Sequence, residues 1–457
     1  MPILTDFNSM FTSLRQGFDS RMASGTLTMD QVVQETHELT DRIAREQIQD
    51  YVQVLDERLR NSQLRKKDYS IERRNQTKTI ATTAGPVVFD RTYFRDKKTN
   101  HHVCLVDRLL GLEPHQRISR ELASCLLSSA KDISYQGTVE RYASSGITSR
   151  TTVMNLVHRL GNIESSEGPL PQKKVVSRIY IEADEDHVAM QDGSNQQMRL
   201  IYVHEGQQSV GKRRKALMGV RRFAGFYKGN SDELWYEVFD YLNSAYEVDK
   251  IEEISLSGDG ATWIKMGAQI LPRCKLYLDK FHLEKALRQA ATPIDSYKGT
   301  KDEYYWYLKD AISMDSLEDI NTFFESAAGL PLKKTQEKKL GEMQTYLVSN
   351  WESIQNAAKS GYQGCSAEGH VSHVLSSRLS SRPMGWSTVG AENIARMRVF
   401  VLNGGDLMGY FAAKEKEKKK EARLVRLEKR IVKKSRVYPV KQGSISYATP
   451  HFGWYKS

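Results

Sequence analysis

The sequence of 457 residues has little of what marks secreted proteins. It contains four cysteines, Cys104, Cys125, Cys274 and Cys365, which are widely spaced and form no CxxC pair. A disulfide framework and a complete cysteine–histidine zinc site are therefore excluded, and we expect free thiols in a reducing compartment. The first residues, MPILTDFNSMF, have no basic stretch followed by an apolar run, so no signal peptide is predicted.

Long apolar runs and internal repeats are also absent from the sequence. No segment approaches the roughly 18 apolar residues that a membrane-spanning helix needs, so we expect no membrane partner. No period repeats along the chain, which argues against a solenoid. Together these absences predict a cytoplasmic protein.

Positive charge, by contrast, is in excess. The chain has 67 Lys and Arg against 56 Asp and Glu, a net charge of +11 and a pI of about 9.2. Such an excess favours polyanions such as nucleic acid, although a solvated basic surface gives the same count. Residues 414–436 hold twelve Lys or Arg against four Glu, a net +8. This tail is expected to form a basic helix or a partly disordered arm.

The length predicts two or three structural units, and changes in pattern divide the chain into four regions. Ile48, Val52, Leu55 and Leu59 recur at helical spacing and predict a packing or dimer face. The expected regions are an N-terminal helical region (1–77), a β-hairpin and helix-turn-helix region (78–165), a catalytic core (175–405) with a helical insertion at about 283–360, and a basic C-terminal tail (406–457).

A helix-turn-helix is predicted within residues 133–160. Two short helical patterns flank Ser144-Ser145-Gly146, and a glycine-containing turn is typical of this motif. Thr148 is the expected N-cap of the second helix. The start of that helix carries donors suited to phosphates and base edges, where a recognition helix meets DNA, although a plain helical hairpin has the same pattern. These candidate DNA-binding residues are Thr148, Ser149, Arg150 and Thr152.

From residue 175 onward the pattern changes to strands alternating with helices. Three antiparallel-type strands are followed by helix, strand, helix and strand, which predicts a mixed α/β sheet. The expected strands are 175–191, 198–204, 216–227, 251–258 and 274–281, with a turn at Asp192-Gly193 and a helix at 234–246.

Acidic residues gather at three places in this region. Four of the five residues from Glu182 to Asp186 are acids, which are poor strand formers. Asp259 follows another strand between two glycines, and Glu368 opens a later helix. Carboxylates meeting at one sheet edge would repel one another, and a pair of divalent cations would resolve that repulsion. Taken singly, Asp259 could be a turn residue and Glu368 a helix-start acid favoured by the helix dipole.

The order of these acids resembles the DDE transposases of bacterial insertion sequences. It is most similar to the ISLre-two family, relatives of the Mutator-like transposases, with Asp184 in IEADEDHV, Asp259 in SLSGDGATWIK and Glu368 in SAEGHVSHVLSSRLSSRPMGW. LDKFHLEKAL, with Asp279 and His282, is similar to the Asp-x-x-His signature of Mutator-like enzymes. The resemblance extends back to RTYFRDKKTNHHVCLVDRLLGLEPHQRIS and covers about Asp68 to Gly405.

The resemblance implies a fold, a reaction and a site. It implies an RNase H-like core in which Asp184, Asp259 and Glu368 are catalytic and bind Mg²⁺ or Mn²⁺, expected as two ions. The family pattern is similar to Ala-Asp-x-x-His-Val, which fits Asp184 as the first ligand, with Asp186 on the same strand face as the alternative. Asp279 and His282 are candidates for the edge of the site, although His282 could also be structural.

The implied partners are the ends of a mobile element and its target DNA in a bacterial cytoplasm, bound by a homodimer or higher oligomer. Further candidate phosphate contacts are Lys265, Arg378 and Arg382. Lys212, Arg213 and Arg214 either touch DNA or form a basic loop tip. Two other functions remain open from the sequence: a non-catalytic helix-turn-helix regulator, and a metal-dependent nuclease without strand transfer.

Overall fold

The computed structural model describes residues 3–161, 163, 172–211, 214–227, 232–359, 362, 364–382, 384–410 and 412–414. The chain separates into two units, Met1–Leu407 and Met408–Ser457. In the second unit, Lys414 Nζ lies 5.4 Å from the ring centroid of Tyr410. The rest of the predicted basic segment 414–436 lies outside the described residues.

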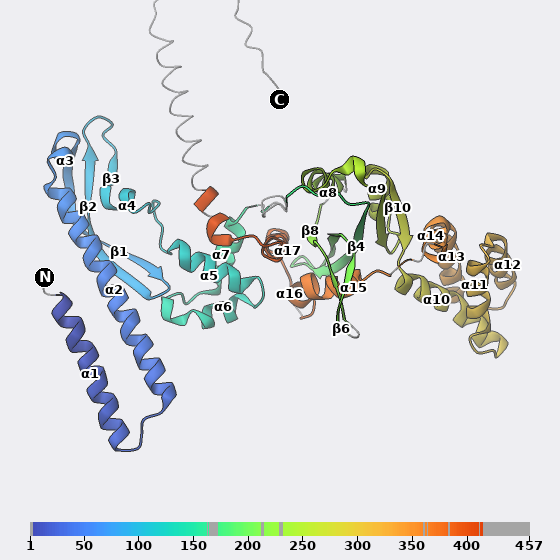
Figure 1. The fold of residues 1–457 in the computed structure, drawn as a ribbon, viewed down its shortest axis with the longest axis horizontal. Helices are drawn as coiled ribbons and strands as arrows, with labels where there is room; N and C mark the ends of the chain where they lie inside the picture. The colour runs from blue at the N-terminus through green and yellow to red at the C-terminus, as the bar shows by residue number, and fades with distance from the viewer. Residues whose placement is uncertain are drawn as a thin grey trace, which may run out of the picture. The chain divides into compact units, whose positions relative to one another are not determined.

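The first unit begins with two long helices, α1 (Ile3–Ala23) and α2 (Met29–Asn61), which pack on each other (Figure 1). A capping box begins α2: the Gln31 amide donates to Thr28 Oγ1 at 3.3 Å, and the Thr28 amide donates to Gln31 Oε1 at 3.0 Å. The expected N-terminal helical region is helical from Ile3 to Asn61, apart from the turn between the two helices.

A three-stranded antiparallel sheet follows. The short helix α3 (Gln63–Asp68) leads into β1 (Tyr69–Thr82), which pairs with β2 (Gly85–Asp96); β3 (His102–Cys104) pairs with β2 and continues into α4 (Leu105–Leu109). The predicted hairpin is confirmed, but β1 starts inside the region expected to be helical up to residue 77. Ile80, Val87 and Phe89 of the hairpin pack against Val52 of α2.

Three helices form the next element: α5 (Arg120–Ala130), α6 (Tyr135–Arg141) and α7 (Arg150–Arg159), with a 3-10 turn, η1 (Ala143–Ser145), between the last two. Gly146 has φ 82°, a left-handed conformation that ends this turn. The two predicted helices are present. However, the cap of α7 is Ser149 rather than Thr148, because Ser149 Oγ accepts the Thr151 amide at 3.2 Å.

A five-stranded mixed sheet forms the centre of the larger region, as predicted. Its order is β10-β9-β4-β5-β8, in which β4, β5 and β8 are antiparallel neighbours and β9 and β10 run parallel to β4. The predicted strand 216–227 is split, because β7 belongs to a separate ribbon with β6. The strands are β4 (Arg178–Ala189), β5 (Asn195–His204), β6 (Gln207–Gly211), β7 (Arg214–Leu217), β8 (Arg221–Gly225), β9 (Glu253–Gly258) and β10 (Cys274–Leu278).

Two helices cover the apolar face of this sheet, α8 (Asp232–Ala245) and α9 (Thr262–Ile270). A 3-10 turn, η3 (Val248–Lys250), links α8 to β9. Ile179, Ile181 and Ala183 alternate along β4 and are fully buried in the core that these helices share. Their alternation fixes the register of β4, so the acids between them lie on the opposite face.

Between β10 and the last helices stands an all-helical insertion with its own apolar core, as predicted (Figure 1). It consists of α10 (Lys280–Lys298), α11 (Glu303–Ser313), α12 (Leu317–Ala328), α13 (Lys334–Ser349) and α14 (Trp351–Lys359). After it come α15 (Ala367–Val371), a π-helical turn η4 (Ser372–Ser376), α16 (Ser377–Leu379) and α17 (Thr388–Leu402). None of the described helices is long and apolar enough to cross a membrane.

Candidate active site

Three aspartates lie at one level where the parallel strands of the central sheet end. Glu182 of β4 is opposite Ser257 of β9, and Gly258 of β9 is opposite Leu278 of β10. Continuing that register places Asp184, Asp259 and Asp279 side by side. We call these three residues the acidic sheet edge. The carboxyl ends of parallel strands are where ligands of α/β sheets commonly bind.

The two glycines around Asp259 explain why β9 ends at this point. A Cβ atom at Gly258 would lie 2.8 Å from the carbonyl oxygen of Ala183 and 2.6 Å from Ile264, so only glycine allows this approach to β4. Gly260 has φ 86°, and a Cβ there would lie 2.4 Å from Asn350. Asp259 is thereby held between β4 and the helical insertion.

Asp259 is fixed by hydrogen bonds at both its backbone and its side chain. Its Oδ1 accepts the Ala261 amide at 2.8 Å, an Asx turn that opens α9. Its carbonyl accepts the Tyr346 hydroxyl of α13 at 2.7 Å. Within the described part of the chain Oδ2 has no hydrogen-bond partner, so this oxygen is available to a ligand.

Asp184 carries a perturbed pKa. Burial, and to a smaller extent the negative charges of Asp259 and Glu185, raise this pKa to about 6. The hydrogen bond from the Glu185 amide and the charge of His282 act in the opposite direction and lower it. The amide of Glu185 donates to Asp184 Oδ1 at 2.8 Å. A half-buried carboxyl beside another carboxylate is costly to ionise, and a cation placed between the two would relieve that cost.

His282 lies at the same edge and is bound to the third aspartate. The Nδ1 atom of His282 and Asp279 Oδ2 are 2.9 Å apart, and this hydrogen bond, partly opposed by burial, raises the pKa of His282. Asp279 is 7% exposed. The Asp-x-x-His motif therefore places an imidazole next to the aspartates. Asp279 directly follows β10 as Asp259 follows β9, so it is one of the three aspartates of the acidic sheet edge, with Asp259 between it and Asp184.

Two other acids of β4, Glu182 and Asp186, are hydrogen-bonded to the segment that carries Glu368. Glu182 Oε2 accepts both the amide and the hydroxyl of Ser366 at 2.9 Å. Two pleats further along, the Ser380 hydroxyl donates to both oxygens of Asp186, at 2.8 and 3.0 Å. These two contacts attach the α15–α16 segment to β4 on either side of Asp184. Asp186 is thus occupied by Ser380, which favours Asp184 over Asp186 as a ligand.

Glu182 is the most deeply buried of these acids, at 3% exposure. Its Oε1 atom lies 3.3 Å from Nε2 of His204, which is itself 2% exposed. Burial opposes ionisation, but hydrogen bonds from His204 and Ser366 hold the pKa of Glu182 below its ordinary value. The partners of Glu182 are 22 and 184 residues away in the sequence, so no local pattern predicted them.

Glu368 lies on α15, a short helix that packs against β4. It is exposed in the first turn of α15, two residues after the Ser366–Glu182 contact. Among the described residues, no group of three or more His, Cys, Asp and Glu side chains is arranged to hold a metal ion. Asp184 and Asp259 nonetheless fit Mg²⁺ by chemistry, because this ion binds through one or two carboxylates and takes its other ligands from water and phosphates.

The start of α7 is open to solvent, whereas its end is attached to α17. Thr148, Ser149 and Arg150 are exposed, and Thr152 is half-buried. At the other end, Asn393 Nδ2 donates to the Val157 carbonyl at 2.8 Å. The helix is therefore anchored at the end away from its candidate DNA contacts.

Arg378 is a correction to the sequence analysis. It is 5% exposed and donates through Nε to the Ala130 carbonyl at 3.0 Å. Its guanidinium lies 5.7 and 4.7 Å from the ring centroids of Tyr135 and Trp386. Burial lowers its pKa to about 10. Arg378 joins the helix-turn-helix region to the core, and its burial is at odds with the predicted phosphate contact.

The remaining predicted phosphate contacts are only partly described. Lys265 Nζ donates to the Ser349 carbonyl at 3.0 Å, and Arg382 is exposed. Lys212 and Arg213 lie outside the described residues. Arg214 begins β7, and its side chain is likewise outside them.

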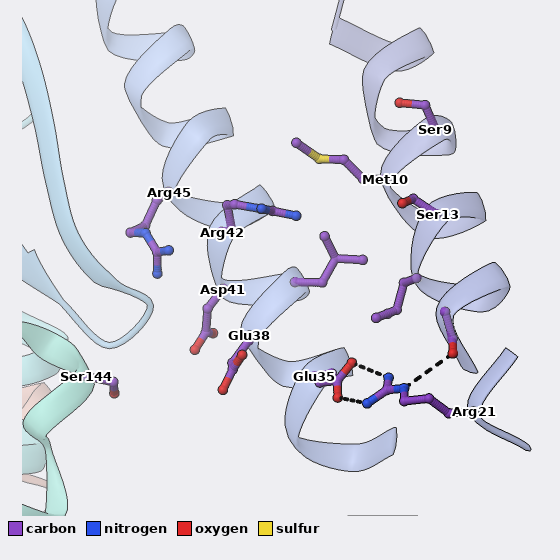
Figure 2. Close-up of a pocket in the computed structure, with 13 residues that line it drawn as sticks. Ser9, Met10, Ser13, Arg21, Glu35, Glu38, Asp41, Arg42, Arg45 and Ser144 are labelled. Atoms are coloured by element: carbon purple, nitrogen blue, oxygen red, sulfur yellow. Dashed lines mark hydrogen bonds and ion pairs between the residues drawn. The ribbon is translucent and has the colours of Figure 1, made fainter. Parts of the chain in front are cut away.

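An open hollow of about 890 Å³ lies between α1 and α2 (Figure 2). The guanidinium of Arg21 donates two hydrogen bonds of 2.6 Å to the carboxylate of Glu35 across it. None of the predicted metal or DNA contacts is among its described lining residues. The hollow therefore has no role in the candidate site.

Comparison with known proteins gives the family. Residues 22–420 match the uncharacterised protein family UPF0236, and the chain belongs to this family. In Caldanaerobacter subterraneus subsp. tengcongensis, a UPF0236 protein whose name joins eleven loci, from TTE0033 to TTE2212, is 33% identical over 391 residues, 85% of this chain and 81% of the relative. UPF0236 protein TTE2489 of the same strain is 33% identical, covering 83% and 80%. The UPF0236 protein in the vanSb 3′ region of Streptococcus gallolyticus is 23% identical, covering 72% and 74%.

Proposed function

We propose that this protein is a DNA transposase that binds the ends of a mobile element and catalyses metal-dependent strand cleavage and strand transfer. The observation that carries the proposal is the meeting of Asp184 and Asp259 at the acidic sheet edge, where burial and mutual charge raise the pKa of Asp184 to about 6. Perturbed carboxyls of this kind cluster at catalytic sites.

Two further observations support the proposal. The strand order β8-β5-β4-β9-β10, with three antiparallel strands followed by two parallel ones, is the arrangement expected of an RNase H-like core. The name of one relative joins eleven loci of a single strain, and multiplication within a genome is an expected consequence of transposition.

The residues at the edge have separable tasks. Mg²⁺ or Mn²⁺, expected as two ions at Asp184 and Asp259, would supply the positive charge that activates a water and stabilises the phosphate. Tyr346 and the flanking glycines hold Asp259 in place. Asp279 orients His282 toward both aspartates. Ser366 and Ser380 keep the segment bearing Glu368 beside β4, so Glu368 can approach when DNA binds.

The exposed first turn of α7 would select the DNA. Arg150 and the hydroxyls of Thr148 and Ser149 are donors for base edges and phosphates. The contacts of α7 with α17 and of Arg378 with Ala130 connect this helix to the core. Recognition of an element end would then position the phosphate to be cut, which is the main contribution a protein makes to such a displacement.

The test uses Asp184→Asn and Asp259→Asn on a labelled duplex that carries the inverted repeat flanking the gene. Cleavage and joining with Mg²⁺ or Mn²⁺ should each fall roughly 100-fold or more, about 3 kcal/mol of transition-state stabilisation. DNA binding, measured on the same proteins, should persist. Asp186→Asn is the matched control, because Asn can still accept from Ser380, and it should cut at close to the parent rate.

Each alternative function has its own outcome in this experiment. Cleavage by the parent without joining would identify a nuclease. Specific binding without any metal-dependent cleavage would identify a regulator. If Asp186→Asn loses cleavage and joining but Asp184→Asn does not, the first metal ligand is Asp186 and not Asp184.

A further inference from the structure

A second charged surface lies at one end of the β1–β2 hairpin. Residues 63–75 and 91–102 together carry nine Lys and Arg against three Asp and Glu, a net charge of +6. The hairpin brings them together, with Ser70 opposite Arg95. Lys97 Nζ also donates to the Lys66 carbonyl at 2.7 Å. The structure therefore unites two basic segments that are separate in the sequence.

The cations of this surface are exposed. We define the ribbon patch as Lys66, Lys67, Arg73, Arg74, Arg95 and Lys97, all exposed to solvent. Among the residues that the structure describes, none of the six forms an ion pair with a carboxylate. Neighbouring Lys98, in contrast, lies 3.5 Å from Asp68 and is left out of the patch. Like charges gathered without counter-charges in water attract a polyanion.

The backbone of β1 is irregular at this patch. Two bulges interrupt its pairing with β2, one between Ile71 and Arg73 and one between Arg73 and Gln76. Asn75 adopts φ 52°, a left-handed conformation. These register shifts leave Arg74 and Asn75 without a partner in the ladder, whereas Arg73 stays paired with Tyr93. A bulge redirects the side chains around it, and both Arg73 and Arg74 are exposed to solvent.

The opposite end of the same hairpin contacts the helix-turn-helix. A Cβ placed on Gly85 would lie 3.2 Å from the Ser144 carbonyl, and one placed on Gly146 would lie 3.5 Å from Pro86. Arg95, which is opposite Ser70, is twelve residues of β1 (82 − 70) from the end at Thr82, and Arg74 is eight (82 − 74). At the rise of a strand these separations are roughly 25–40 Å. One turn of duplex DNA is about 34–36 Å long.

We propose that the ribbon patch binds the phosphate backbone of the duplex that α7 contacts, about one helical turn from the recognition helix. The inference rests on the proposed function, because it takes duplex DNA as the partner. Lys and Arg on an exposed ribbon neutralise phosphates without reading bases, so the contact adds affinity and sets orientation while sequence choice stays with α7.

The experiment compares a four-residue variant with a matched control. The variant combines Lys66→Gln, Lys67→Gln, Arg73→Gln and Arg74→Gln. The control removes four exposed charges from the helical insertion: Lys298→Gln, Lys301→Gln, Lys334→Gln and Lys338→Gln. Binding is measured over a range of salt concentrations on a long duplex carrying the terminal repeat, and on duplexes shortened from one side in steps of a few base pairs.

The expected results concern salt and length. Log affinity against log salt should lose about 0.9 of slope for each phosphate contact removed, up to about 3.6 for the variant, and little for the control. Shortening the duplex by a helical turn should weaken the parent and the control but leave the variant unchanged. The preference for the repeat over random DNA should be equal in all three.

Three outcomes would overturn the inference. If the salt slope and the length dependence are unchanged in the variant, the ribbon patch does not contact the DNA. Repeat-specific cleavage by the same protein would still support the proposed function. Tighter binding of the parent to single-stranded RNA, lost in the variant, would reassign the patch to RNA. Failure of the parent to bind or cut any duplex would reject both the patch and the proposed function.

Discussion

The acidic sheet edge and the ribbon patch both gather charges of one sign, but in opposite surroundings. At the edge, Asp184 is half-buried and its pKa is raised to about 6. In the patch, cations such as Lys66 and Arg74 are exposed, where water and salt screen their repulsion. The buried cluster therefore costs free energy that a small cation would recover, whereas the exposed cluster costs little and attracts any extended polyanion.

A third arrangement, two residues from Asp184 on β4, shows how an acid is held when it needs no external ligand. Glu182 is more buried than Asp184, yet its pKa lies below the ordinary value because, against burial, His204 and Ser366 donate to it. Burial alone therefore does not mark a ligand site. The distinguishing feature of Asp184 is a half-buried carboxylate beside other acids, whose single amide hydrogen bond does not offset its burial.

Removing Glu182 should have the largest effect on stability and would test that distinction. Glu182→Ala leaves the Ser366 amide and His204 buried without their acceptor, which costs about 3–5 kcal/mol. Glu182→Gln keeps an acceptor oxygen and most of the volume, so about 1–2 kcal/mol is expected. Urea unfolding of both variants at pH 7 measures the difference. Equal losses would mean that the negative charge beside His204, which both variants remove, explains the contribution of Glu182, and not the acceptor oxygen and volume that Gln keeps.

The pH dependence of the parent checks the same residue. The folded pKa of Glu182 is below its unfolded value of 4.5, so the stability it contributes is present above pH 4.5 and is lost as pH falls through the folded pKa. Glu182→Gln removes this contribution. The difference between parent and variant should therefore shrink in acid, and a difference that grows below pH 4.5 would contradict the assignment.

The stability contribution of Asp184 should depend on pH in the opposite direction to that of Glu182. The folded pKa of about 6 lies above the ordinary 3.8, so the contribution of Asp184 is full below pH 3.8 and is lost as pH rises through 6. In metal-free buffer at pH 7 to 8 the Asp184→Asn variant should be more stable than the parent, by up to about 3 kcal/mol. Thermal unfolding from pH 4 to 8 measures this gain, which should disappear toward pH 4.

Added Mg²⁺ tests whether Asp184 is a metal ligand or an ordinary structural acid. If Asp184 and Asp259 share a cation, added Mg²⁺ should stabilise the parent and raise its unfolding temperature. The same addition should do much less for Asp184→Asn, and Asp186→Asn should respond like the parent. A variant less stable than the parent throughout, with identical responses to Mg²⁺, would mean that Asp184 is an ordinary structural acid.

Much of this arrangement was predictable because its signals are local. Alternation of Ile179, Ile181 and Ala183 fixed which face of β4 bears the acids, and the glycines around Asp259 marked a strand end. The mixed sheet followed from hydrophobic period, and the insertion from a polar helical pattern between the last strand and the motif around Glu368. Even here the cap of α7 was misplaced by one residue, because Thr148 and Ser149 are both good caps and only the backbone decides between them.

The errors and omissions share a different cause. Arg378 was predicted to be a phosphate contact because it follows the motif around Glu368, but Tyr135 and the Ala130 carbonyl, which hold it, come from a distant part of the chain. The Glu182–Ser366 contact spans 184 residues, and the ribbon patch joins two separate segments. Each of these contacts depends on tertiary packing between separate elements. The hydrophobic period within one element does not predict which other element it contacts.

The smallest expected effect is that of replacing Arg150. It tests whether α7 contacts base edges, in contrast to the phosphate contacts proposed for the ribbon patch. Arg150 is exposed in the first turn of α7, where a bidentate contact to a base edge is worth about 1–3 kcal/mol. Arg150→Ala should lose that amount on the terminal repeat and much less on random DNA. Arg159→Ala, an exposed arginine at the last position of α7, is the matched control and should leave both affinities near the parent values. Competition between repeat and random duplexes at fixed salt measures the ratio of the two affinities directly. Equal losses on both DNAs would make Arg150 a phosphate contact like those proposed for the ribbon patch, and sequence choice would then rest on the hydroxyls of Thr148, Ser149 and Thr152.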